Sequence, residues 1–91
     1  MTDRSSPAPT DARTAVLTLL DARAADATIC PNEAARVLAT AAGAAEDWRA
    51  AMPQVHAAVD ALVAEGRVAL SWQGAAMPER SGPYRIRRRA G

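Results

Sequence analysis

The spacing of apolar residues changes at Gly66, and this change constrains the fold more than any other feature of the chain. Before Gly66, apolar residues recur every three or four positions, which is typical of amphipathic helices. After it, Val68, Leu70 and Trp72 alternate with small or polar residues, which is typical of a half-buried strand. Glycine readily adopts the left-handed conformation that ends many helices. The sequence therefore predicts a helical part followed by a β part, an α+β fold.

Two helices are expected in the first half of the chain. The first is predicted over residues 11–25, where apolar residues recur at helical spacing. Residues 26–30 leave room only for a turn and a strand of two or three residues. Pro31 fits the first position of a second helix, because its missing N–H is harmless there. Gly43 is placed to end that second helix.

The third helix is expected to begin at Pro53. The apolar stripe in this region consists of Trp48, Met52, Val55, Val59 and Leu62. Proline lacks the N–H that a mid-helix position needs, and it disfavours helical geometry at the residue before it. We therefore predict a short turn over residues 47–52 and a main helix over 53–65, which Gly66 ends.

Two strands are expected after Gly66. The first continues its alternation through Trp72, and in the second Tyr84 and Ile86 alternate with arginines. The glycine-, proline- and serine-containing stretch between them, residues 74–82, predicts a loop. The strands should therefore pair as a β-hairpin with a long tip. We expect both tryptophans and the Tyr84 ring in the core, with the Tyr84 hydroxyl exposed.

Length and composition indicate one small domain. The chain has 91 residues, too few for a second core. Residues 1–10 are rich in Ser, Pro and Thr without periodic apolar positions, so we predict a disordered tail there and a single domain over 11–89. Every basic residue is arginine. Together with the excess of alanine, this indicates coding bias in a GC-rich bacterial genome more than a need for arginine chemistry.

The residues that carry chemistry in other proteins are sparse. Cys30 is the single cysteine, so no internal disulfide forms, and no Cys/His set has the spacing of zinc ligands. No stretch is long enough to span a membrane and no signal peptide is present, so we expect a soluble cytoplasmic protein. His56 has no nucleophile near it in sequence, and no glycine-rich phosphate loop occurs. We therefore expect no enzyme, no cofactor and no small-molecule site, with Cys30 buried and His56 partly exposed.

Several segments of the chain resemble known domains. The element order, helix, short strand, helix, helix, strand, loop, strand, resembles the winged-helix variant of the helix-turn-helix, as does LVAEGRVAL at 62–70. More narrowly, ICPNEAARVL at 29–38, DWRAAMPQV at 47–55 and GPYRIRR at 82–88 are similar to a small bacterial winged-helix family classed as a domain of unknown function. The resemblance covers residues 11–89 and implies three helices plus a C-terminal β-hairpin wing. It implies no activity.

Positive charge gathers at the end of the chain, where residues 80–91 contain arginines and no acid. Arginines on a wing would contact backbone phosphates, which position a protein without reading sequence. Base contacts would fall to the exposed side of the third helix, where Arg49, Gln54 and His56 have suitable groups and Asp60 would repel phosphates. The candidate nucleic-acid-binding residues are Arg49, Gln54, Arg80, Arg85, Arg87, Arg88 and Arg89.

Two hypotheses about function remain open. In the first, the arginines of the wing contact the phosphate backbone of double-stranded DNA, so the domain binds weakly and acts in transcription regulation. In the second, it is a protein-interaction or dimerisation module without nucleic-acid binding, whose alanine-rich third helix packs on itself or on another protein. An edge strand protected by charge would show the same arginine pattern. A continuous positive surface joining the wing, Arg49 and the start of the third helix would favour the first hypothesis.

Overall fold

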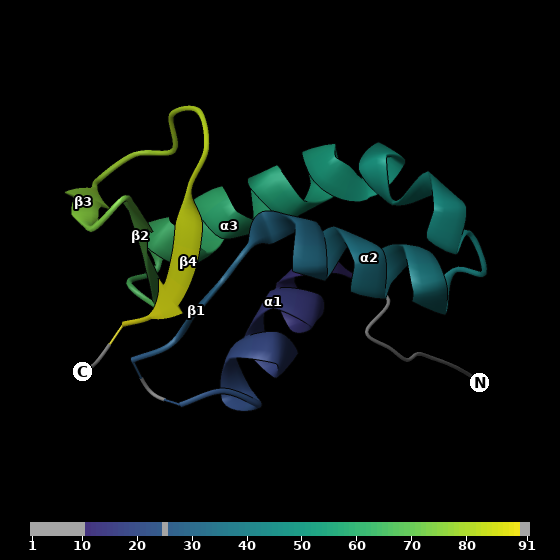
Figure 1. Ribbon diagram of the computed structural model, residues 1–91, viewed down its shortest axis with the longest axis horizontal. Helices are drawn as coiled ribbons and strands as arrows, with labels where there is room; N and C mark the ends of the chain where they lie inside the picture. The colour runs from purple at the N-terminus through teal and green to yellow at the C-terminus, as the bar shows by residue number, and fades with distance from the viewer. Residues whose placement is uncertain (1–10, 25, 90–91) are drawn as a thin grey trace.

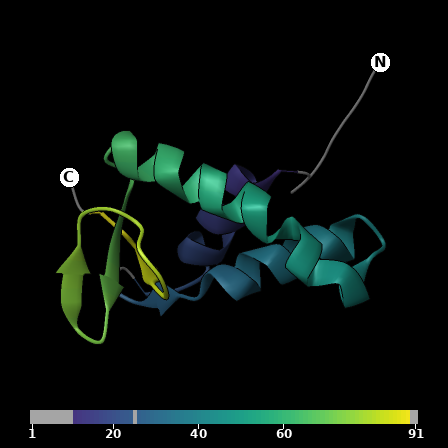
Figure 2. The same ribbon diagram turned by 90° about the horizontal axis from the view of Figure 1, so that it is seen from above.

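Three α-helices pack beside a four-stranded antiparallel sheet in the computed structural model, which describes residues 11–24 and 26–89 (Figures 1 and 2). The elements in chain order are α1 (Ala12–Asp21), β1 (Thr28–Ile29), α2 (Pro31–Ala41), the 3-10 helix η2 (Ala45–Ala51), α3 (Met52–Ala64), β2 (Val68–Trp72), β3 (Ala75–Met77) and β4 (Arg85–Arg88). The predicted α+β class is confirmed, and the element order is compatible with a winged helix. The tail predicted over 1–10 lies outside the described residues.

α1 begins as expected but ends early. The Asp11 carboxylate accepts the backbone N–H of Thr14 at 2.7 Å, which satisfies a donor that the helix start leaves open. The helix stops at Asp21, so the predicted continuation toward residue 25 is wrong. The next three residues, 22–24, are all exposed and include no large apolar side chain, so nothing holds another turn against the core.

Two prolines position the starts of the other helices. Pro31 is the first residue of α2, and Gly43, with a φ of +76°, follows the end of that helix as predicted. α3 begins at Met52 with Pro53 in its second position, one residue earlier than expected. The predicted short turn before it is a full 3-10 helix, η2. Gly66 has a φ of +75°, which confirms that it ends the helical part.

The sheet has the strand order β1-β4-β2-β3. Leu70 lies opposite Ile86 in the antiparallel β2–β4 pair, which confirms the predicted pairing. The prediction of a long hairpin tip is wrong, because Ala75–Met77 forms β3 along the other edge of β2. Gln73 and Gly74, with φ of 51° and 84°, make the tight turn between β2 and β3. The interpretation of the arginine strand as a charged edge is also wrong, because β4 lies between β1 and β2.

The core lies between the helices and one face of the sheet. Its largest fully buried side chains are Val16, Ile29, Val55, Val59, Leu62, Val68 and Ile86. Trp48 is half-buried and packs against this core, but Trp72 is 39% exposed, so the prediction that both are core residues is wrong for Trp72. Trp72 lies at the far end of β2, where the helices no longer cover the strand. Cys30 is half-buried rather than buried.

Candidate nucleic-acid interface

Arg80 and Arg88, two of the predicted site residues, are held by acidic partners. Arg80 donates from Nε and Nη2 to the Asp60 carboxylate of α3, at 3.0 and 3.1 Å, which fastens the loop after β3 to α3. The hydrogen bond from Arg80 lowers the pKa of Asp60. Arg88 donates from Nη2 to the Leu20 carbonyl at 2.9 Å and to the Asp21 carboxylate at 3.1 Å. Because carbonyls at a helix end have no intrahelical partner, Arg88 caps α1.

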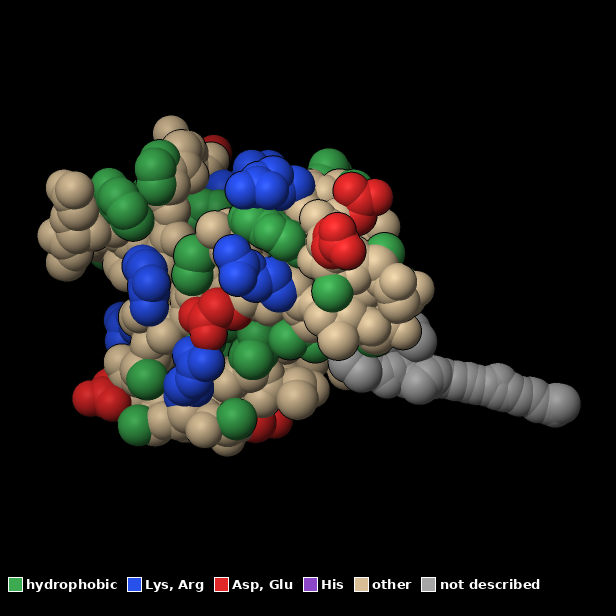
Figure 3. Space-filling model, turned by 45° about the vertical axis from the view of Figure 1, so that its right-hand side comes forward, with side chains coloured by type: hydrophobic (Ala, Val, Ile, Leu, Met, Phe, Trp, Pro, Cys, Tyr) green, Lys and Arg blue, Asp and Glu red, His purple; other side chains and the backbone are tan. Residues whose placement is uncertain are grey.

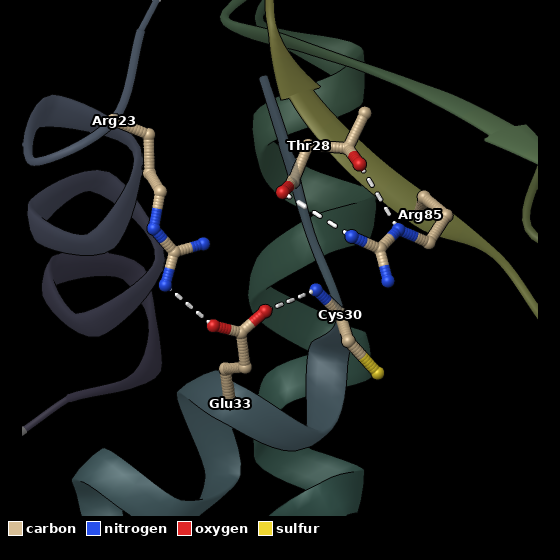
Figure 4. A network of polar contacts seen from close by, with 5 residues as sticks. All are labelled: Arg23, Thr28, Cys30, Glu33 and Arg85. Carbon is tan, nitrogen blue, oxygen red and sulfur yellow. Dashed lines mark hydrogen bonds and ion pairs between the residues drawn. The ribbon is translucent and has the colours of Figure 1, made fainter.

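Arg85 belongs to a network where β1 meets α2 (Figure 4). Its Nε and Nη2 donate to the hydroxyl and carbonyl oxygens of Thr28, at 3.0 and 3.3 Å. Beside it, the Glu33 carboxylate accepts from Arg23 at 2.6 Å and from the Cys30 backbone N–H at 2.8 Å. The Arg23 hydrogen bond lowers the pKa of Glu33. These bonds join β1, α2 and β4, so two of the five Arg85 N–H donors serve the fold.

The outer face of the sheet carries the exposed Arg87. Two further exposed arginines, Arg67 just before β2 and Arg89 just after β4, line a depression together with Leu17 and Asp21 of α1. Among the described residues, no acidic side chain forms an ion pair with these three arginines. Alternation from the buried Ile86 places Arg87 on this face, between its neighbours Thr28 and Ala69. Arg89 lies two residues further on, and its backbone N–H donates to the carbonyl of Arg67 at 3.1 Å. We call Arg67, Arg87 and Arg89 the sheet arginines.

Arg49 lies in η2, at the opposite end of the molecule from the sheet, and α3 runs from one end to the other (Figures 1 and 2). The Arg49 guanidinium carbon is 4.5 Å from the centre of the Trp48 indole, and that of Arg36 is 4.6 Å from it. On the face that Figure 3 draws, basic side chains lie beside hydrophobic ones, with acidic side chains close to them. Of the predicted arginines, Arg87 and Arg89 thus lie at the sheet and Arg49 lies in η2, at the far end of α3. The described residues do not form the one continuous positive surface that would have favoured DNA binding.

The outward side of α3 between these two places is almost uncharged. Ala57, Ala61 and Ala64 are exposed along it, and the carboxylate of Asp60 is occupied by Arg80. Gln54 is exposed in the first turn and borders a shallow depression of about 370 Å³. The other residues lining this depression are Leu38, Ala39, Ala42, Ala44, Asp47, Ala50 and Ala51. Of the residues that could read base edges, only Gln54 points outward from the body of α3.

His56, on the inner flank of α3, is bonded to the start of β4. Its Nδ1 lies 2.7 Å from the hydroxyl of Tyr84, which is only 3% exposed, so the prediction of an exposed hydroxyl is wrong. Burial raises the pKa of Tyr84 to about 12. Burial, assisted by the positive charge of Arg80, lowers the pKa of His56, while Asp60 acts in the opposite direction. Both pKa shifts fit a neutral imidazole whose Nδ1 accepts a hydrogen bond from the protonated Tyr84 hydroxyl.

The sequence of this chain matches a known protein family. A family model described as "Protein of unknown function (DUF3253)" matches residues 9–89, nearly the whole chain. The chain belongs to this family. Membership in DUF3253 confirms the likeness to a domain of unknown function that the sequence indicated. Among curated proteins none matches the chain. The family description states no activity, so any functional argument rests on the arginines and their surroundings.

Sequence reasoning missed two further arginines. Arg67 precedes Val68, and the same alternation that placed Arg87 outward would have placed Arg67 outward as well. Arg36 had no such signal, because its contact with Trp48 joins two different elements. In the part of the chain that the structure describes, no group of acidic, histidine or cysteine residues could hold a metal ion. None of the described helices combines the length and apolar character needed to cross a membrane.

Proposed function

We propose that this domain is a winged helix that binds double-stranded DNA by contacting phosphates at both ends of α3. In this proposal it acts by binding rather than by catalysis. In this arrangement α3 is the presented helix, β2, β3 and β4 form the wing, and transcription regulation is the process it serves. The observation that carries the proposal is the set of sheet arginines, three exposed guanidinium groups without an acidic partner in the described part of the chain.

The spacing of the sheet arginines suits a polyanion. Residues two positions apart in extended backbone, such as Arg87 and Arg89, lie about 6.7 Å apart, and Arg67, just before β2, lies beside Arg89, just after β4. Like charges held this close repel one another, and an anionic backbone relieves that repulsion. Each arginine that contacts a phosphate also releases condensed counterions from DNA, which drives binding at low salt. This surface therefore favours a nucleic-acid backbone as its partner.

Little sequence preference is expected from α3. Alanine side chains have no hydrogen-bonding group for base edges, and Ala57, Ala61 and Ala64 occupy the outward positions. Gln54 in the first turn is suited to an adenine edge, but one such contact discriminates by only about 1–3 kcal/mol. We therefore propose backbone-dominated binding, with affinity set mainly by ionic strength.

Fluorescence anisotropy of a labelled DNA duplex, recorded between about 50 and about 200 mM salt, tests the proposal. With the three sheet arginines and Arg49 each neutralising a phosphate, the log–log slope of affinity against salt should be about −3.6. Arg13→Gln with Glu65→Gln is a matched control, because it removes the ion pair at 2.6 Å between these residues without changing the net charge or freeing a carboxylate near Arg67; it should leave the slope unchanged. No binding at about 50 mM salt would overturn the proposal.

A protein-interaction role is the second candidate, favoured by the exposed alanines of α3. Ala57, Ala61 and Ala64 lie three and four residues apart, on one side of the helix, where small side chains allow another helix to approach closely. Light scattering on the pure protein would then show a dimer, and Ala61→Arg would convert it to a monomer. A protein that stays monomeric at all concentrations removes self-association through α3.

A further inference from the structure

Two guanidinium groups from different elements lie over one indole ring. Arg36 comes from α2, whereas Trp48 and Arg49 come from η2, which packs against α2. The guanidinium carbons are 4.6 and 4.5 Å from the ring centre, within the range of cation–π attraction. Trp48 is half-buried and packed against the core, while both arginines are exposed. The packed indole of Trp48 therefore limits the conformations of the two exposed arginine side chains that contact it.

The stacking orders these arginines without neutralising them. Among the described residues, no carboxylate forms an ion pair with Arg36 or Arg49. The acidic residues nearest to Arg49 in sequence, Glu46 and Asp47, are exposed and pair with neither arginine in the described part of the chain, and Glu33, the acid nearest to Arg36, pairs with Arg23. Contact with a ring face leaves the in-plane N–H groups of a guanidinium available as donors. Two ordered positive groups with unused donors around one ring are arranged to receive an anion.

We propose that Arg36, Trp48 and Arg49 form a phosphate clamp, in which the two arginines bind a backbone phosphate of DNA and Trp48 positions them. The inference rests on the proposed function and adds a second phosphate contact, remote from the sheet arginines. Arginine suits this ligand because its planar fork donates two parallel hydrogen bonds to phosphate oxygens. Trp48 acts through the arginines rather than by stacking on a base, because guanidinium groups already occupy positions over its ring.

The surroundings of the clamp fit a phosphate-bearing chain that passes along the surface. A shallow depression of about 370 Å³ lies beside Arg36 and is lined also by Val37, Thr40 and Ala41. Thr40 is exposed one helical turn after Arg36, on the same side of α2, so its hydroxyl is a third donor at this place. η2 leads directly into α3, which places the clamp at the start of that helix.

A single-tryptophan protein gives a direct readout of the clamp. In Trp72→Phe the remaining indole is Trp48, and the exposed position of Trp72 makes this substitution mild. Titration with unlabelled DNA duplex should change the Trp48 emission with the same midpoint as the anisotropy titration. The matched control, Trp48→Phe, reports Trp72 and should show no such change. Constant Trp48 emission while anisotropy records binding would overturn the clamp and leave the DNA proposal standing.

Inorganic phosphate separates a nucleic-acid contact from a site for a small phosphate ligand. The clamp proposal expects the Trp48 emission to respond to duplex at concentrations far below those at which inorganic phosphate acts. A response to inorganic phosphate with none to duplex would overturn the proposal, because the arginines would then serve a different ligand. Loss of DNA binding in every assay would instead overturn the proposed function itself.

Substitutions of the two arginines and of Trp48 test the role of each in the clamp. Arg36→Gln with Arg49→Gln should weaken DNA binding and make the salt slope shallower by about 0.9, because the clamp holds one phosphate. Arg36→Lys with Arg49→Lys keeps the charge but loses the planar fork, and we expect about tenfold weaker binding with the salt slope largely retained. Trp48→Leu should weaken binding by a similar factor. If the lysine pair binds as tightly as the native protein, the clamp is wrong even where Trp48→Leu fails to fold.

Discussion

The two faces of β4 use neighbouring residues for opposite purposes. On the inner face Tyr84 and Ile86 are 3% and 0% exposed and lie in the core. On the outer face Arg85 contacts Thr28, and Arg87 is exposed to solvent without an acidic partner in the described residues. One short strand thus contributes stability through one face and positive charge through the other. The difference shows that a mutation's effect on this strand depends on which face it alters.

The run of arginines does not translate directly into positive surface. Of the arginines in residues 80–89, Arg80 and Arg88 are paired with carboxylates and Arg85 is bonded to Thr28. Among the described residues, Arg87 and Arg89 form no ion pair, and Arg67, which directly precedes β2, lies beside Arg89. The charge of a segment therefore has to be combined with strand register and with nearby acids before it indicates a ligand.

The largest effect is expected on the inner face. Ile86→Ala removes a fully buried side chain from the strand that joins β1 to β2, and it should lower the free energy of unfolding by about 2–5 kcal/mol. Urea denaturation followed by circular dichroism measures this. Arg87→Ala, one residue along on the outer face, is the control and should change stability by less than about 0.5 kcal/mol. Equal effects of the two substitutions would contradict the division between the faces.

The next effect concerns binding and belongs to the outer face. Arg87→Gln with Arg89→Gln removes two phosphate contacts, so DNA affinity at about 50 mM salt should fall on the order of a hundredfold, with the slope shallower by about 1.8. Stability should stay within about 0.5 kcal/mol of the native protein, which denaturation checks. Unchanged affinity in this variant would remove the sheet arginines from the interface.

Much of the fold followed from the sequence because it depends on local signals. Pro31, Pro53 and Gly66 set helix boundaries through their own backbone geometry, and the apolar alternation predicted the two strands that pair around Leu70 and Ile86. β3 escaped prediction because its residues, Ala75–Met77, carry no alternation. That strand forms because a tight turn returns the chain along β2.

The candidate site was less accessible to sequence reasoning, since each arginine's role depends on a distant partner. The Asp60 partner of Arg80 and the Leu20 partner of Arg88 come from other elements. The exposure of Trp72 likewise depends on how far the helices extend over β2, which its correct inward alternation does not reveal.

A smaller loss of stability is expected from Arg88→Ala. This substitution leaves the Leu20 carbonyl at the end of α1 without its donor and removes the ion pair with Asp21, at a cost of about 1 kcal/mol after allowing for exposure to solvent. Hydrogen exchange should also be faster in the last turn of α1. A change no larger than that of Arg87→Ala would show that the bonds from Arg88 to Leu20 and Asp21 do not stabilise the fold.

The smallest effect is a pH dependence that belongs to the inner face. Burial and Arg80 hold the pKa of His56 below its usual value of 6.5, so the unfolded chain binds a proton more readily than the folded one. The contribution of His56 to the free energy of unfolding is therefore complete above the pKa of the unfolded chain. It declines as the pH falls from there through the lower pKa of the folded protein.

His56→Gln keeps an acceptor for the Tyr84 hydroxyl but does not titrate, so its stability should vary less between about pH 7.5 and about pH 5.5. The carboxylates paired with arginines, such as Asp60, have pKa values lowered from 3.8 and titrate below this range. Denaturation of both proteins across the range measures the difference, and identical pH profiles would show that protonating His56 leaves the contact between α3 and β4 unaffected.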